Sequence, residues 1–202
     1  MIGRVIEATP YPWPYDGLPA PDRMALVLVA PQAAFAWMDA TGRVREACLR
    51  LRRAAEAAGL GLCLLRLGRG LGSPRRLSWL PEAAAPGWAW LPGFEPRPQT
   101  LVVDVPALDG FYATGLEAHL WAAGIRHLLL AGFGTETAVH STLRSANDRG
   151  FECLVLEDAC AAVDPAIHPQ SMRTIEMSGG IFGAYTGSDT LLQALDKQVS
   201  IP

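Results

Sequence analysis

The chain has 202 residues, of which 50% are hydrophobic and 18% are charged, so it has enough apolar side chains to bury one sizeable core. Its net charge of −3 offers no basic surface to nucleic acid, and its apolar runs are far shorter than the roughly 20 residues that span a bilayer. We therefore expect one globular domain with no nucleic-acid or membrane partner. Because the first residues lack a signal-peptide pattern, we also expect a cytoplasmic location.

The N-terminal segment differs in composition from the rest. Residues 1–23 are rich in proline and aromatic residues, which favours an extended arm over a helix or a central strand. Residues 24–202 are predicted to form a single domain. It opens with an apolar run of strand length at 25–29. Apolar residues then recur at helical spacing from 44 to 58, and Gly59 ends this helix.

The remaining pattern alternates between strands and helices. Further strands are predicted at residues 60–67, 100–105, 127–131, 152–157 and 180–185. Further helices are predicted from a capping box at Thr114 and Glu117 to Gly124, from Thr135 to Gly150, and through Met177. Apolar strands that alternate with helices indicate a parallel sheet covered on both faces. The predicted fold is therefore α/β, a doubly wound three-layer sandwich with a six-stranded, mainly parallel sheet.

Two groups of reactive or charged side chains have structural explanations. The cysteines lack a C-x-x-C pair, so we expect buried, reduced thiols and neither disulfides nor a zinc site; they are Cys48, Cys63, Cys153 and Cys160. The arginines between residues 43 and 53 are expected on the solvent face of the first helix. No two histidines have metal-ligand spacing, so we predict no metal and no cofactor.

Three strand ends carry sequence motifs that resemble those of the isochorismatase-like cysteine hydrolases. Residues 131–140 read AGFGTETAVH and resemble the family's nucleophile turn, G-x-x-T-x-x-C-V, with Ala138 at the cysteine position. Residues 30–35 read APQAAF and resemble D-x-Q-x-x-F, with Ala30 at the aspartate position. Val105 stands six residues before a phenylalanine, where the family has a lysine.

The resemblance covers about residues 8–195. The segments 8–17, 147–158 and 178–183 look most like the biuret hydrolase branch, whose enzymes hydrolyse small ureides. Residues 68–98 match that branch poorly and look shortened.

The family chemistry needs a thiolate nucleophile, which a nearby lysine and an aspartate activate. None of these groups is present at the three matching positions, so the resemblance implies a catalytically silent protein, a pseudoenzyme. It could act as a structural or regulatory subunit, or bind a small amide or ureide. The loss is self-consistent, because removing all three groups leaves no buried charge without a partner.

The resemblance also implies where a ligand pocket lies. Its predicted lining is Gln32, Phe35, Phe111, Phe133, Gly134, Thr135 and Ala138. Backbone N–H groups near Gly134 and Ala138 could form an anion cradle at the start of a helix. Members of the family often have a non-proline cis peptide before this turn, which by position would join Phe133 to Gly134.

A second hypothesis is a hydrolase that cleaves C–N bonds of a small amide or ureide without a cysteine. Glu136 and His140 could form an acid/base pair, although at this spacing they also fit an ordinary surface pair. Asp104 precedes the lysine position, but strand alternation directs its side chain to the opposite face, which favours a role in helix capping or at the sheet edge over one as a catalytic acid.

The resemblance implies an oligomer. We expect a homo-oligomer, dimer or tetramer, or a hetero-oligomer with an active homologous hydrolase. The proline-rich arm and the tryptophan-rich loop at 79–90 are the candidate contacts.

Overall fold

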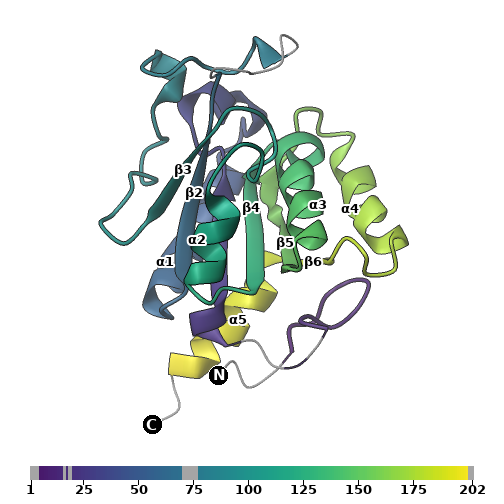
Figure 1. Ribbon diagram of the computed structural model, residues 1–202. Coiled ribbons are helices and arrows are strands. Elements are labelled where there is room, and N and C mark those ends of the chain that lie inside the picture. The colour runs from purple at the N-terminus through teal and green to yellow at the C-terminus, as the bar shows by residue number, and fades with distance from the viewer. Residues whose placement is uncertain (1–4, 16, 18–19, 70–76, 200–202) are drawn as a thin grey trace.

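Six strands form one sheet in the computed structural model, which describes residues 5–15, 17, 20–69 and 77–199 (Figure 1). All pairings between neighbouring strands are parallel, and the strand order is β3-β2-β1-β4-β5-β6. The strands are β1 (Met24–Val29), β2 (Gly61–Leu67), β3 (Leu101–Val105), β4 (His127–Phe133), β5 (Glu152–Ala161) and β6 (Ala184–Thr186). The predicted α/β fold with a six-stranded parallel sheet is confirmed.

Helices cover both faces of this sheet. They are α1 (Arg43–Ala57), α2 (Leu116–Ala122), α3 (His140–Asp148), α4 (His168–Met177) and α5 (Ser188–Val199). Shorter helical turns are η1 (Pro21–Arg23), η2 (Ala33–Met38), η4 (Pro86–Trp88) and the π-helical turn η5 (Thr135–Val139). Helices α1 and α5 pack together on one face, and Figure 1 shows α2 and α3 in front of the other. The result is the three-layer sandwich.

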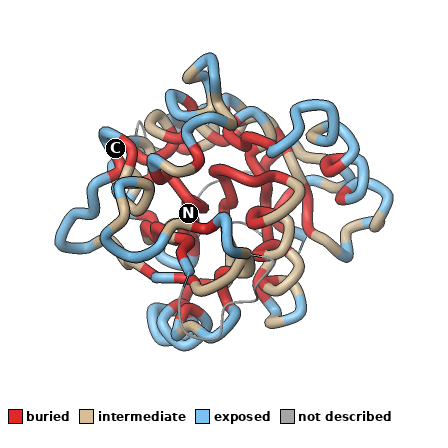
Figure 2. The backbone as a smooth tube through the Cα atoms, turned by 90° about the horizontal axis from the view of Figure 1, so that it is seen from above, coloured by how far each residue is buried: buried red, intermediate tan, exposed pale blue. Residues whose placement is uncertain are grey.

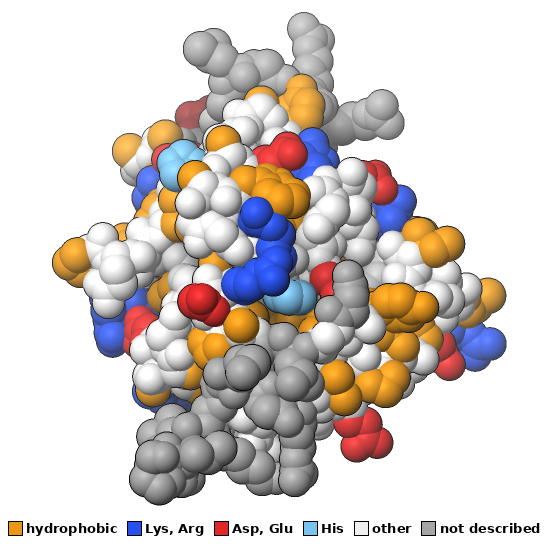
Figure 3. All heavy atoms as spheres, turned by 60° about the horizontal axis from the view of Figure 1, so that its bottom comes forward, with side chains coloured by type: hydrophobic (Ala, Val, Ile, Leu, Met, Phe, Trp, Pro, Cys, Tyr) orange, Lys and Arg blue, Asp and Glu red, His pale blue; other side chains and the backbone are white. Residues whose placement is uncertain are grey.

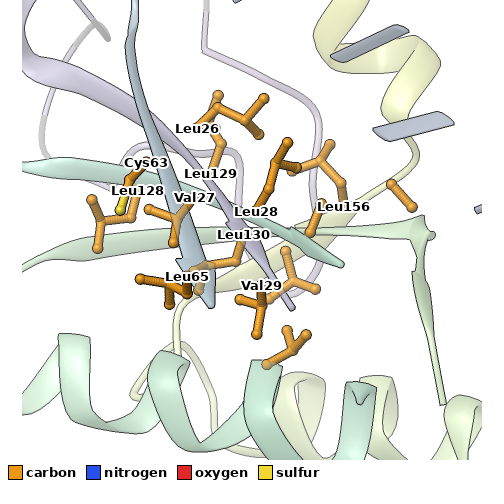
Figure 4. Packing of buried hydrophobic residues seen from close by; sticks show 14 of the residues in the cluster. Leu26, Val27, Leu28, Val29, Cys63, Leu65, Leu128, Leu129, Leu130 and Leu156 are labelled. Carbon is orange, nitrogen blue, oxygen red and sulfur yellow. The ribbon is translucent and has the colours of Figure 1, made fainter. Parts of the chain in front are cut away.

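The two layers of helices explain why the central strands are apolar throughout. Every residue of β1 is buried, and its side chains pack against those of β2, β4 and β5 (Figure 4). A strand that helices cover on both faces has no polar side, so its sequence is a continuous apolar run and not an alternating one. Figure 2 shows the buried backbone gathered in the centre of the molecule, with exposed loops around it.

Several boundaries differ from those predicted. Strand β5 continues to Ala161, and its pairing with β4 shifts register between Leu130 and Gly132. Helix α2 begins one residue later than predicted, with Gly115 as its N-cap. The Thr114 hydroxyl donates to the Gly110 carbonyl at 2.7 Å and accepts the Leu116 N–H at 3.4 Å, but the reciprocal capping box does not form, because the Glu117 carboxylate pairs with Arg149.

One arginine of α1 was predicted wrongly. Arg52 is only 3% exposed, and its guanidinium donates to the Gly93 carbonyl at 2.7 Å, the Glu95 carbonyl at 2.9 Å and Glu56 at 3.1 Å. Arg97 binds the other oxygen of Glu56 at 2.6 Å. Burial of an arginine is tolerated when carbonyl and carboxylate oxygens accept hydrogen bonds from its N–H groups. Here these hydrogen bonds join the loop before β3 to α1.

The N-terminal arm packs against the chain's own sheet. Ile6 and Trp13 exchange two backbone hydrogen bonds, of 2.6 and 2.8 Å, and both side chains are buried. The Trp13 ring meets the ring of His127 edge to face. Thr9 exchanges backbone hydrogen bonds of 3.0 and 2.8 Å with Tyr185, so the arm extends the sheet beyond β6.

Within the described parts of the chain, the helices are too short or too polar to cross a bilayer. On the face shown in Figure 3, basic and acidic side chains are interspersed, in keeping with the small net charge.

Candidate functional site

The strand order places a change of direction between β1 and β4. The chain runs from β1 to β2 and β3 on one side of the sheet, then returns to β4 on the other side of β1. In open parallel sheets, ligands bind at such a switch point, beyond the carboxyl ends of the strands. Ala30 directly follows β1, and η5 follows β4, so the chain leaves both strands at this crevice.

Close approach of β1 and β4 at this point depends on Gly132. A Cβ atom on Gly132 would lie 2.1 Å from the Val29 carbonyl oxygen and 2.7 Å from the Val29 nitrogen. Gly132 also has a φ of 130°, in a region that side chains other than glycine rarely adopt. This position therefore excludes any side chain and sets the distance between the two strands that flank the crevice.

Ala30 occupies an unusual backbone conformation. Its φ is 52°, in the left-handed region where a Cβ atom is unfavourable and where asparagine and aspartate are enriched. Its N–H donates to the Leu65 carbonyl at 2.9 Å, and its carbonyl accepts the Gln32 N–H at 2.7 Å. The two hydrogen bonds hold a turn that alanine does not itself favour.

The turn after β4 is built around Gly134. This residue is left-handed, with φ 85° and ψ 60°, and its N–H donates to the Ala161 carbonyl at 2.7 Å. Its carbonyl accepts N–H groups from Thr137 at 3.1 Å and Val139 at 2.9 Å. The peptide between Phe133 and Gly134 is not the non-proline cis bond that members of the family often have at this place. The cis bonds of the described chain both precede prolines in the N-terminal arm, and the left-handed glycine makes the reversal without one.

The three positions matched to reactive residues are buried and apolar. Ala30 and Val105 are each 1% exposed, and Ala138, within η5, is 2% exposed. Ala30 and Ala138 belong to the segments that flank the switch point. Val105 ends β3, which β2 separates from β1, and its carbonyl accepts the Gly68 N–H at 3.0 Å.

The predicted pocket residues at the start of η2 are engaged with the protein itself. The amide of Gln32 is fully buried; it donates to the Leu67 carbonyl at 3.0 Å and accepts the Leu67 N–H at 2.7 Å. Both of its polar ends thus continue the hydrogen bonding of β2 beyond the strand. The ring of Phe35 meets the ring of Trp79 edge to face, with centroids 6.2 Å apart.

Phe111 lies away from the crevice. Its ring stacks on that of Phe151, with centroids 5.8 Å apart, and the Arg149 guanidinium lies over it at 5.1 Å. Phe151 directly precedes β5, so this contact is at the amino end of the strand. The structure therefore does not bring Phe111 together with Phe133 and Gly134.

The polar side chains of η5 contact the loop and helix that follow β5. The buried Thr135 hydroxyl lies 3.1 Å from Nδ1 of His168, the first residue of α4. The Glu136 carboxylate accepts the N–H groups of Val163 and Asp164, each at 3.1 Å. The contact with His168 was missed by the sequence analysis, because the two residues lie on elements whose mutual packing has no local signal.

His140 follows η5 and shares a surface hollow of about 250 Å³ with Glu136. The hollow is also lined by Ile167, Gln170, Ser171 and Thr174. Burial, and to a smaller extent the charge of Arg144, lowers the pKa of the His140 imidazole below 6.5. This shift favours the neutral imidazole, and the structure brings the two predicted acid/base residues to one surface depression.

Asp104 is held at the edge of the sheet, as strand alternation predicted. Its carboxylate accepts two hydrogen bonds from Arg66 on β2, at 2.7 and 3.1 Å. The guanidinium also lies 4.4 Å from the ring of Trp88 and 5.2 Å from that of Trp90. Sequence analysis missed Arg66, although the parallel register that pairs it with Asp104 could have indicated this ion pair.

No cysteine is suited to nucleophilic catalysis. All four thiols are buried, and burial raises their pKa values, to about 12 for Cys63 and Cys160. The thiol, and not the reactive thiolate, is therefore the form present at neutral pH. Within the described residues, no three His, Cys, Asp or Glu side chains gather so that they could hold a metal ion.

The comparison with protein families covers the whole sheet. Residues 24–186 match the isochorismatase domain. The chain belongs to the isochorismatase family. The match spans all six strands, including β1, β3 and β4, whose carboxyl ends carry the three motifs. The predicted resemblance to this superfamily is confirmed.

Curated relatives include two amidohydrolases. The isochorismatase-family chain is 32% identical over 206 residues to the ureidoacrylate amidohydrolase RutB of Methylorubrum extorquens, covering 85% of this chain and 82% of the relative. It is 29% identical over 209 residues to the ureidoacrylate amidohydrolase RutB of Acinetobacter baylyi, covering 86% of this chain and 84% of the relative.

Solved structures share the fold. A cysteine hydrolase from Pseudomonas syringae pv. phaseolicola has a TM-score of 0.80 at 20% identity, covering 98% of this chain and 99% of the other. A hydrolase of the isochorismatase family from Chromobacterium violaceum has a TM-score of 0.72 at 30% identity, covering 89% of this chain and all of the other.

Proposed function

We propose that this protein is a catalytically silent member of the isochorismatase family that serves ureide or amide metabolism as a structural or regulatory subunit, or as a binder of a small ligand. The observation that carries this proposal is chemical. The positions matched to the family's aspartate, lysine and cysteine hold Ala30, Val105 and Ala138. An amide bond cannot be attacked by a methyl or isopropyl group, and the chain's own cysteines are buried thiols.

The burial of these positions supports the proposal. All three side chains are almost completely buried, so a charged group at any one of them would need a partner. With all three apolar, the interior needs no compensating charge. The retained left-handed turn at Ala30 fits a scaffold that has kept its backbone shape after losing the side chain that favoured it.

The proposal is tested by an ammonia-release assay on biuret, ureidoacrylate and small amides. We expect the purified protein to give no release above that of a protein-free control. A matched triple variant, with Ala30→Asp, Val105→Lys and Ala138→Cys, asks whether only the reactive groups are missing. Saturable turnover by the unchanged protein would overturn catalytic silence.

The subunit role is tested by native mass spectrometry of the protein purified gently from its own host. A mixed assembly with an intact cysteine hydrolase is the expected result for a regulatory or structural subunit. A homo-oligomer without an additional chain would contradict that role and leave ligand binding, which the same spectrum reports as retained small-molecule mass.

A second candidate function is a cysteine-independent hydrolase acting on a C–N bond of a small amide or ureide. The observation that favours it is the hollow shared by Glu136 and His140, whose pKa burial lowers. Against it, both carboxylate oxygens of Glu136 already accept backbone N–H groups. Turnover that is lost in Glu136→Gln and in His140→Ala, but kept in a control variant of exposed His119, would establish this function. Turnover that survives both changes would indicate a contaminating hydrolase.

A further inference from the structure

Helix α4 lies at the outer edge of the molecule, beside α3, and has one side in the core and one side at the surface (Figure 1). Its inner side packs against β6 and η5 through the buried side chains of Ser171, Met172 and Ile175. Its last residue, Met177, is 75% exposed, and Ile181 in the turn that follows is 70% exposed. The segment therefore has apolar side chains at the surface in addition to those that pack in the core.

The exposed apolar side chains follow the spacing of a helix–helix contact. Ile167, which is the N-cap of α4, is also exposed, and it lies at the opposite end of the helix from Met177. Gln170 and Thr174 occupy the positions between, so residues 167, 170, 174, 177 and 181 alternate steps of three and four. Residues at these steps share one side of a helix, and this is the repeat of a seam that packs on a second helix. Single exposed apolar residues are common, whereas a row on one side indicates an interaction surface.

The charges on the exposed side of α4 are complementary to those of a second, antiparallel copy of the helix. Arg173 and Glu176 are both exposed, and among the described residues neither has an ion-pair partner. A two-fold axis near Thr174 would place Arg173 of one copy level with Glu176 of the other, and the symmetry would form this pair twice. The same axis would bring the Ile167 end of one helix to the Ile181 end of the other, so apolar side chains would meet apolar side chains.

We propose that α4 is an interface between two copies of this chain, which pair antiparallel about a two-fold axis near Thr174. The row of exposed apolar side chains is buried in this contact, and two ion pairs between Arg173 and Glu176 flank it. Because Thr174 also lines the hollow of Glu136 and His140, the second copy covers that hollow. The inference goes beyond the proposed function, since it holds whether or not the protein is catalytically silent.

Sedimentation velocity of the purified full-length protein tests the interface, and we expect a dimer that dissociates on dilution. Met177→Glu should weaken dimerisation by about tenfold or more, because it places a carboxylate in an apolar contact. Its side chain is exposed, so the change leaves the core intact. Tyr112→Glu changes another exposed apolar side chain, outside α4, and should leave the dimer unchanged. A monomer at every concentration would overturn the proposal and leave this face to a different protein, and a dimer that Met177→Glu does not weaken would also overturn it.

Charge reversal separates a contact between copies from a contact within one helix. Arg173→Glu and Glu176→Arg each create two like-charged pairs across the axis, so each should weaken dimerisation by about tenfold or more. When the two variants are mixed in equal amounts, both pairs between unlike copies again join opposite charges. Native mass spectrometry should then show a heterodimer in excess of either homodimer. A mixture that dimerises no better than either variant alone would overturn the proposed pairing.

Discussion

Replacement of Gly132 by alanine is expected to destabilise the protein more than the same change at another left-handed glycine. The added Cβ would lie 2.1 Å from the Val29 carbonyl oxygen and 2.9 Å from the Val29 carbonyl carbon. These are backbone atoms of a central strand, so neither can move without disturbing the pairing of β1 with β4.

Two effects contribute to the expected magnitude. Placing a Cβ at a positive φ costs about 1–2 kcal/mol, and overpacking the interior costs about 1–3 kcal/mol. The expected loss for Gly132→Ala is therefore about 2–5 kcal/mol, a large part of the roughly 5–15 kcal/mol typical of a domain. Gly124 is a matched control, because its φ is 77° and a Cβ added there would meet no atom within 4 Å. Gly124→Ala should cost only about 1–2 kcal/mol.

Urea unfolding followed by circular dichroism gives both free energies by linear extrapolation. The difference between the two variants isolates the steric contact with Val29. The reasoning would be refuted if Gly132→Ala were no less stable than Gly124→Ala. Such a result would mean that β1 and β4 can separate at their carboxyl ends at little cost.

Three further predictions concern charged and titratable groups. Arg52→Ala should lower the free energy of unfolding by about 2–4 kcal/mol, because two carbonyls and Glu56 lose a donor, whereas Arg53→Ala should change it by less than about 0.5 kcal/mol in the same urea assay. The pKa of His140 is lower in the folded than in the unfolded protein, so protons favour unfolding as the pH falls through the ordinary histidine pKa of about 6.5. The stability difference between the unchanged protein and His140→Gln, measured by urea unfolding on either side of that pH, should therefore shift in favour of the variant at the lower pH. The four cysteines should resist alkylation by iodoacetamide at about pH 8 in the folded protein and react fully in urea, as measured by mass spectrometry. Rapid alkylation of any thiol in the folded protein would contradict the raised pKa values.

The sheet could be predicted from the sequence because its signals are local. The runs that form β1 and β2 are apolar and end near glycine or proline, and the strand and helix order follows from that alternation. Helix α5 was not predicted, since no element was expected after residue 185. The short turn η2 was also missed, because a six-residue 3-10 helix is too short to show a helical repeat of apolar residues.

The candidate site was harder to predict because it depends on contacts between distant segments. The motifs lie at the ends of β1 and β4, which the strand order places side by side. They could not indicate that both polar atoms of the Gln32 amide bind the backbone of Leu67. Nor could they indicate that Phe111 packs at the amino end of β5, away from the crevice. These contacts form between segments that are distant in the sequence and are brought together only when helices pack on the sheet. The spacing of residues along the chain therefore does not predict them.

The backbone pairing of Thr9 with Tyr185 has a practical consequence for anyone who shortens this protein. The outer edge of β6 would otherwise present unpaired N–H and C=O groups, which invite pairing with another chain. Trimming the first fifteen residues as a dispensable tail would uncover that edge and also empty the buried site of Trp13. We therefore expect a trimmed protein to aggregate on concentration, and an affinity tag to be better tolerated when it is attached at the other end of the chain.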